Sequence, residues 1–147
     1  MPTPIILDCD PGHDDAIAIL LALASPEVEL LGITTVHGNQ TLDKTTQNAL
    51  KVLELAGRSD VPVARGAERP LVRELSVASH VHGESGLDGP SLPDPTGRPV
   101  DDDAVSFLAE HLVPGVVLVP TGSLTNIAQL ITEHPGVRPE RIVLMGG

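Results

Sequence analysis

A cluster of four carboxylates follows the first apolar run of the chain and is the feature best able to do chemistry. Its members are Asp8, Asp10, Asp14 and Asp15. An apolar run followed by Pro11-Gly12 is typical of a strand that ends in a tight turn. So much like charge in one turn is unfavourable unless a cation compensates it, and carboxylate oxygens suit the hard ions Ca²⁺ and Mg²⁺. We therefore expect a divalent metal site, since a helix start would explain only Asp14 and Asp15.

Three further segments carry polar side chains that could bind a ligand. They are Thr34–Gln40, His80–Gly86 and Val119–Asn126. Asn39 offers a donor and an acceptor, which suits a sugar hydroxyl, although Gly-Asn is equally typical of a plain turn. His80 and His82 alternate as zinc ligands can, but no Cys or third His accompanies them at ligand spacing, which favours contact with substrate or solvent. Ser123 and Thr125 fit a helix start without any ligand.

The pattern around these segments predicts alternating strands and helices. Strands are expected at 4–9, 29–36, 61–64, 116–120 and 141–145, and helices at 14–24, 42–56, 102–112 and 124–133. This alternation predicts an α/β fold of the doubly wound, Rossmann-like type, with a mostly parallel sheet and helices on both faces. Open sheets of this kind bind ligands at the carboxyl ends of their strands. The carbonyl of Thr121 would therefore face the same crevice as the carboxylates.

Four residues are expected to end helices. Asp101 and Ser123 suit the N-cap positions of the third and fourth helices. Gly57 and Gly136 follow the second and fourth helices, where a left-handed residue is favoured.

The bulk composition narrows the classes of partner. The net charge is −11, from nine Lys plus Arg against twenty Asp plus Glu, which argues against nucleic acid and anionic membranes but not against a small neutral substrate. Phe107 is the sole aromatic residue, so Leu, Val, Ile and Ala must build the core, as in a covered parallel sheet. With Cys9 as the one cysteine and no signal peptide or membrane span evident, a cytoplasmic location is predicted.

Residues 1–147 are expected to form a single α/β domain, because no linker divides the chain. The stretch 66–99 is rich in Gly, Pro, Ser and His and predicts a long irregular segment with a functional role. The sequence stops at the segment Val143–Gly147, at the tip of a predicted strand. We therefore expect the sheet to be truncated at the C-terminus, with this chain as the N-terminal half of a longer domain.

Taken together, five segments resemble the nucleoside hydrolases, the inosine-uridine preferring N-ribohydrolase family. They are Ile6–Ala16, Thr34–Gln40, His80–Gly86, Val119–Asn126 and Val143–Gly147, in the family's order along the whole chain. The resemblance implies hydrolysis of the N-glycosidic bond of ribonucleosides to free base and ribose. It also implies Ca²⁺ as the cofactor, a small ribonucleoside as the partner and a homo-oligomer when full length.

The resemblance implies a role for each residue near the metal. Asp10, Asp15 and the carbonyl of Thr121 match the family's metal ligands. Asp10 also matches the general base that takes a proton from metal-bound water. Asp8 matches a motif position that we expect to support these ligands without binding the ion.

The resemblance implies substrate contacts as well. Asp14 and Asn39 match residues that hold the ribose hydroxyls, and His82 matches a loop residue near the nucleobase. In the family, one further metal-binding Asp, more ribose contacts and a His thought to assist the leaving base come from beyond the position of Gly147. We therefore expect the isolated 147 residues to have weak activity or none.

Two alternatives remain open. A phosphohydrolase of the haloacid dehalogenase type, with Mg²⁺, also has Asp-x-Asp after its first strand, here Asp8 and Asp10, and a Thr after a later strand, here Thr121. The Asp14-Asp15 pair and the lack of a convincing later Lys count against it. The second alternative is a metal-binding but inactive fragment, which would bind Ca²⁺ without turnover. No dinucleotide or P-loop motif is present.

Overall fold

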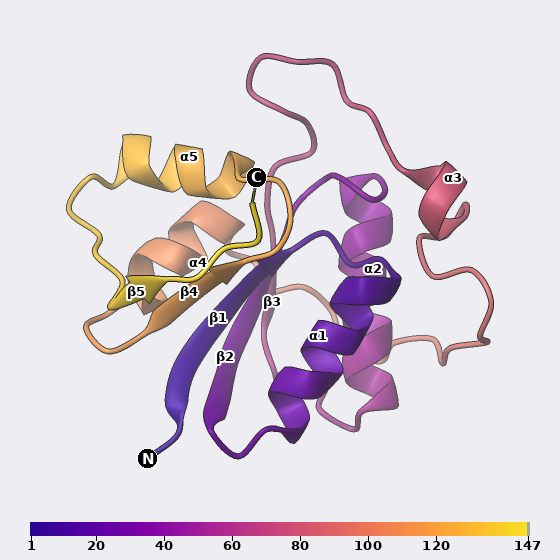
Figure 1. Ribbon diagram of the computed structural model, residues 1–147, viewed down its shortest axis with the longest axis horizontal. Coiled ribbons are helices and arrows are strands. Elements are labelled where there is room, and N and C mark those ends of the chain that lie inside the picture. Colours follow the sequence, from indigo (N-terminus) through magenta and orange to yellow (C-terminus); the bar gives the residue numbers. More distant parts are fainter. Residues whose placement is uncertain (147) are drawn as a thin grey trace.

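The computed structural model describes residues 1–146 and contains a five-stranded parallel sheet with helices on both faces (Figure 1). The strands are β1 (Thr3–Cys9), β2 (Val28–Thr35), β3 (Val63–Arg65), β4 (Val117–Pro120) and β5 (Arg141–Ile142). The helices are α1 (His13–Ala24), α2 (Leu42–Leu55), α3 (Ser79–His82), α4 (Ala104–His111) and α5 (Thr125–Glu133). The predicted doubly wound α/β class is confirmed.

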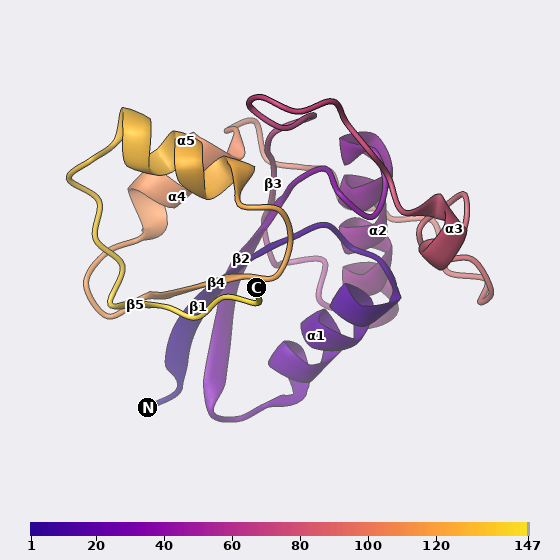
Figure 2. The same ribbon diagram turned by 45° about the horizontal axis from the view of Figure 1, so that its top comes forward.

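Two apolar cores lie on opposite faces of the sheet. Helices α1 and α2 cover one face, and α4 and α5 cover the other (Figures 1 and 2). Side chains of β1 alternate between them: Ile5 and Leu7 join the α1–α2 core, whereas Ile6 joins Phe107 and Leu108 in the α4–α5 core. The same alternation puts Asp8 on the α5 side of the sheet.

The strand order decides which loops meet. The order is β3-β2-β1-β4-β5, so β1 lies between β2 and β4. In register, Asp8 of β1 is opposite Thr34 of β2 and Pro120 of β4. The chain winds outward in one direction through β2 and β3 and in the other through β4 and β5. The carboxyl end of β1 is thus a topological switch point, the place where doubly wound folds bind ligands.

The end of the sheet differs from the prediction. β5 ends at Ile142, although Val143 N and Met145 N still donate to Leu118 O (2.9 Å) and Pro120 O (3.0 Å). The pairing therefore continues past the short strand. Gly147, the last residue of the strand-tip segment, lies outside the described residues.

The predicted helix ends are partly wrong. Asp103, and not Asp101, is the N-cap of α4, where its side chain accepts from Ser106 N at 2.8 Å. Gly57 follows α2 with a φ of +65°, as predicted, whereas α5 ends at Glu133 without a left-handed residue at Gly136.

The stretch 66–99 is irregular apart from α3, and polar contacts join it to the rest of the fold. Gln40 Nε2 donates to Gly83 O at 3.0 Å, and Asn48 Nδ2 donates to Ser85 O at 2.8 Å. Leu87 is buried in the α1–α2 core. These contacts hold α3 beside the start of α1 (Figure 2). No helix within residues 1–146 has the length and apolar character needed to cross a membrane.

Candidate functional site

The carboxylate cluster lies at the switch point, because β1 ends there and α1 starts directly afterwards. Asp8 is in β1, Asp10 follows it, and Asp15 lies in the first turn of α1. The loop after β4 reaches the same place, since Thr121 N donates to Asp8 O at 2.8 Å. None of the ion pairs found within residues 1–146 involves these carboxylates. Their mutual repulsion is therefore not offset by a Lys or Arg partner.

Asp8 is fully buried and joins three elements. Its Oδ1 accepts from Thr34 Oγ1 at 2.6 Å and from Asn126 Nδ2 at 2.7 Å, which connects β1 to β2 and α5. Its Oδ2 is buried and has no hydrogen-bond partner among residues 1–146. Burial raises the pKa of Asp8 to about 6, against the two side-chain hydrogen bonds that lower it. Asp8 is thus enclosed and cannot contact a substrate.

Asp10 lies in a narrow slot between two glycine-containing loops. A Cβ at Gly122 would lie 2.6 Å from Asp10 Oδ1, and Gly38 approaches the carboxylate from the other side. Asn39 N donates to Asp10 Oδ2 at 2.6 Å, and Asn39 Nδ2 donates to Asp10 O at 3.0 Å. Burial raises the pKa of Asp10 to about 7, the Asn39 amide opposes this shift, and the charge of Asp15 adds to it. The carboxylate is therefore held in one orientation, and its raised pKa makes it a stronger base than an exposed Asp.

Asp15 and Thr121 are in direct contact across the switch point. Thr121 Oγ1 donates to Asp15 Oδ1 at 2.7 Å, while Asp15 Oδ2 is buried and finds no partner in the described part of the chain. Burial raises the pKa of Asp15; the Thr121 hydrogen bond opposes the rise, and the charge of Asp14 adds to it. The structure thus brings together three of the predicted ligand residues, Asp10, Asp15 and Thr121.

The predicted substrate residues surround this group. Asn39 contacts Asp10 directly, as described above. Asp14 is exposed in the first turn of α1. His82 lies at the end of α3, with its Nδ1 3.3 Å from the backbone N of His13. A Cβ at Gly12 would lie 2.6 Å from His82 Nδ1 and 2.8 Å from Asn39 Nδ2, so both side chains pack closely against the turn between Asp10 and Asp15.

The donor chemistry of the cluster fits a hard cation. Two acidic side chains with raised pKa values meet beside the loop after β4, whose Thr121 Oγ1 donates to Asp15 Oδ1, and Asp15 Oδ2 has no donor within residues 1–146. Within residues 1–146, however, no three His, Cys, Asp or Glu side chains come together as a metal site. Because Ca²⁺ takes roughly six to eight oxygen ligands, most of them would have to come from backbone, water, substrate or other protein groups.

Several contributing residues were not predicted as such. Asn126 Nδ2 donates to Asp8 Oδ1 and to Thr35 O (3.0 Å), and its Oδ1 accepts from Ala67 N at 2.9 Å. Ser123 donates to His37 O at 2.7 Å and does not cap α5. The sequence feature that could have indicated this role is Asn126 itself, a poor helix former in the segment after a predicted strand. Its partner Asp8 is 118 residues away in the sequence.

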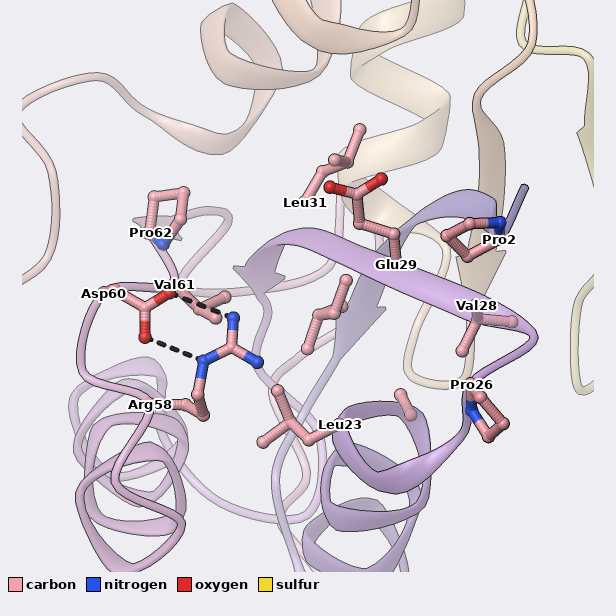
Figure 3. A pocket seen from close by; sticks show the side chains of 12 residues that line it. Pro2, Leu23, Pro26, Val28, Glu29, Leu31, Arg58, Asp60, Val61 and Pro62 are labelled. Carbon is pink, nitrogen blue, oxygen red and sulfur yellow. Dashed lines mark hydrogen bonds and ion pairs between the residues drawn. The ribbon is translucent and has the colours of Figure 1, made fainter.

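A separate cavity of about 480 Å³ lies at the opposite, amino end of the strands (Figure 3). Pro2, Val28 and Pro62 line it, and Arg58 and Asp60 form an ion pair at its edge, with contacts of 2.8 and 2.9 Å. None of the predicted site residues lines this cavity. Its size therefore says nothing about the chemistry of the carboxylate cluster.

Comparison with known proteins agrees with the geometry. Residues 5–147 match the family model described as inosine-uridine preferring nucleoside hydrolase. The chain is 59% identical over 152 residues to a pyrimidine-specific ribonucleoside hydrolase RihA of Shewanella sp. (strain MR-7), and 57% identical to that of Salmonella arizonae. These matches cover 100% of the chain and 48% and 49% of the relatives. The chain thus spans about half the length of the curated relatives it matches.

Solved structures of nucleoside hydrolases also superpose closely on this chain. The purine-preferring ribonucleoside hydrolase from Gardnerella vaginalis superposes with a TM-score of 0.91 at 37% identity, covering 98% of this chain and 48% of that one. A plant nucleoside hydrolase, the PpNRh1 enzyme, superposes with a TM-score of 0.90 at 38% identity, covering 100% and 48%. The chain belongs to the inosine-uridine preferring nucleoside hydrolase family.

Proposed function

We propose that this chain carries the metal-binding residues and the catalytic general base of an enzyme that hydrolyses ribonucleosides to free nucleobase and ribose. The observation that supports this most is the meeting of Asp10, Asp15 and Thr121 at the switch point, with Asn39 against Asp10. The relatives at 57–59% identity carry pyrimidine-specific names. Pyrimidine ribonucleosides are therefore our proposed substrates.

The proposed cofactor is Ca²⁺, held by the carboxylates of Asp10 and Asp15 and by the carbonyl of Thr121. When bound, a divalent ion supplies an oriented water with a lowered pKa. Asp10 is the proposed general base, because its carboxylate would adjoin the water that the ion holds, within reach of the proton to be removed. Asn39 fixes the orientation of the Asp10 carboxylate through its backbone N–H.

The remaining polar residues act on the sugar and the base in this proposal. Asp14 is exposed beside the cluster and would accept hydrogen bonds from ribose hydroxyls, together with Asn39. The carboxylates would also stabilise the positive charge that develops on the ribose ring as the N-glycosidic bond breaks. His82 would lie near the nucleobase.

The phosphohydrolase alternative has weaker support. In that reaction type the first Asp of Asp-x-Asp attacks phosphorus, and here that residue is Asp8, which is 0% exposed. Membership of the nucleoside hydrolase family also argues against a phosphohydrolase.

The proposal is tested by combining a binding assay with a turnover assay on the 147-residue chain. Isothermal titration calorimetry with CaCl₂ measures binding, and a reducing-sugar assay measures ribose released from uridine, cytidine and inosine. Asp10→Asn is the test variant, and Asp94→Asn, an exposed acid of the 66–99 stretch, is the matched control. We expect Ca²⁺ binding that Asp10→Asn weakens at least tenfold and Asp94→Asn leaves unchanged.

The turnover result separates the remaining possibilities. Ribose release that Asp10→Asn abolishes would support the hydrolase proposal and show that this half suffices. Binding without release would favour the inactive-fragment alternative for the isolated chain. Absence of binding, or equal binding by Asp10→Asn, would refute the proposed metal site.

A further inference from the structure

A buried side chain of α2 contacts both the turn after β1 and the loop after α3. Asn48 is 3% exposed, and its Nδ2 donates to Pro11 O at 3.0 Å and to Ser85 O at 2.8 Å. Both partners are carbonyl oxygens, which can only accept, so the amide nitrogen must face them. The two N–H bonds of one side chain are therefore shared between two segments, each 37 residues away in the sequence.

The turn that Asn48 holds is the one that carries the proposed metal site. Pro11 directly follows Asp10, and α1 with Asp15 begins two residues later. Pro11 has no backbone N–H with which to bind a neighbour. Its carbonyl oxygen is thus the group through which α2 fixes the backbone next to the Asp10 carboxylate.

The loop that Asn48 holds is the one that carries His82. Ser85 N donates to Asp88 Oδ1 at 3.0 Å, and Asp88 N donates to His82 O at 3.4 Å. The loop is thereby closed on itself, so a contact at Ser85 also restrains His82. Gly86 makes room for the amide, since a Cβ there would lie 2.8 Å from Asn48 Nδ2.

We propose that Asn48 is a positioning residue that fixes the loop of His82 relative to the turn of Asp10. Asn is a poor helix former, and a buried amide is costly without partners. The two carbonyl oxygens therefore account for an Asn in the interior of α2. The inference rests on the proposed function, in which Asp10 acts beside the ribose and His82 lies near the nucleobase of the same substrate.

The first test uses the native 147-residue chain in EDTA and needs neither metal nor turnover. In ¹H–¹⁵N spectra, the side-chain amide protons of Asn48 should exchange with solvent at least about tenfold more slowly than those of Gln47, its exposed neighbour. A nuclear Overhauser effect should also connect the His82 ring to Gly12, because a Cβ at Gly12 would lie 2.9 Å from His82 Cε1.

The second test removes the donors and keeps the shape of the side chain. Asn48→Leu and Asn48→Asp are both branched like Asn, lack the amide N–H bonds and differ from each other in charge. In both, we expect the backbone amides of residues 83–88 to exchange at least about tenfold faster, by a larger factor than those of β1, and the contact between His82 and Gly12 to be lost. Gln47→Ala is the control and should change neither. A side chain that only filled space could be replaced by Leu without these effects.

Two results would overturn the proposal. One is equal exchange of the Asn48 and Gln47 side-chain amides in the native chain. The other is an Asn48→Leu chain that keeps native exchange in the loop and the contact between His82 and Gly12. If neither variant folds, the comparison within the native chain decides. Failure of the chain to release ribose would contradict the proposed function and leave these results intact.

Discussion

Raising the pH in metal-free buffer should destabilise this protein, and Asp8 should account for a defined share of the loss. Burial raises the pKa of Asp8 from 3.8 to about 6. The folded state therefore binds a proton that the unfolded state has released, and the free energy of unfolding falls as pH rises. The contribution is fully present below pH 3.8 and is lost as pH rises through about 6.

The size of the effect follows from the shift. Two pKa units correspond to about 3 kcal/mol over the whole range, and roughly half of this is lost between pH 5 and pH 8. Asp10 and Asp15 should add to the slope in the same direction, because burial raises their pKa values too. Between pH 5 and pH 8, the free energy of unfolding of Asp8→Asn should therefore fall by less than that of the native chain, and the difference should equal the contribution of Asp8.

The assay is urea unfolding followed by far-ultraviolet circular dichroism at pH 5 and pH 8 in EDTA, since the chain has no Trp or Tyr to report fluorescence. In Asp8→Asn, the new amide nitrogen lies where Oδ2 has no partner within residues 1–146. This unsatisfied amide lowers the free energy of unfolding by about 1–3 kcal/mol at every pH, so it adds nothing to the pH dependence. Asp94→Asn should keep the native slope. The reasoning is refuted if Asp8→Asn and the native chain lose equal stability between the two pH values.

Three further outcomes are expected. At pH 8, CaCl₂ at about one hundred times its dissociation constant should raise the free energy of unfolding by about 2.7 kcal/mol, and Asp15→Asn should abolish this gain. Gly122→Ala should lower Ca²⁺ affinity at least tenfold in calorimetry, because its Cβ would lie 2.6 Å from Asp10 Oδ1, whereas Gly136→Ala, with open space around its Cβ, should not; equal affinities would contradict this. Asn126→Ala should lower the free energy of unfolding by about 3 kcal/mol, because Asp8, Thr35 and Ala67 lose a common buried partner; a loss below about 1 kcal/mol in urea unfolding would argue against it.

The local pattern of the chain was enough to predict the architecture and the place of the chemistry. Apolar runs that alternate with helical periodicity predict a parallel sheet between helices, and β1 and α2 begin or end within one residue of their predicted bounds. Acids after a strand must lie at its carboxyl end. The cluster of Asp8, Asp10 and Asp15 was therefore predictable from neighbours in sequence alone.

Contacts between distant segments were not predictable in this way. Asp103 caps α4 in place of Asp101 because packing of that helix sets where its first turn begins. The single turn α3 has no periodicity of its own to predict it, and contacts from Gln40 and Asn48 hold the segment that follows it.

The amino-acid sequence by itself determined that carboxylates follow a buried strand, because an apolar run and a Pro-Gly turn are local features. Only the tertiary structure decided what surrounds them. Placing β1 between β2 and β4 brings Thr121 onto Asp15 and Asn126 onto Asp8. These pairs are separated by more than one hundred residues, so their contact follows from strand order and helix packing. That environment, and not the residue type, buries Asp8 between strands and helix, and it gives Asp10 a fixed orientation and a raised pKa.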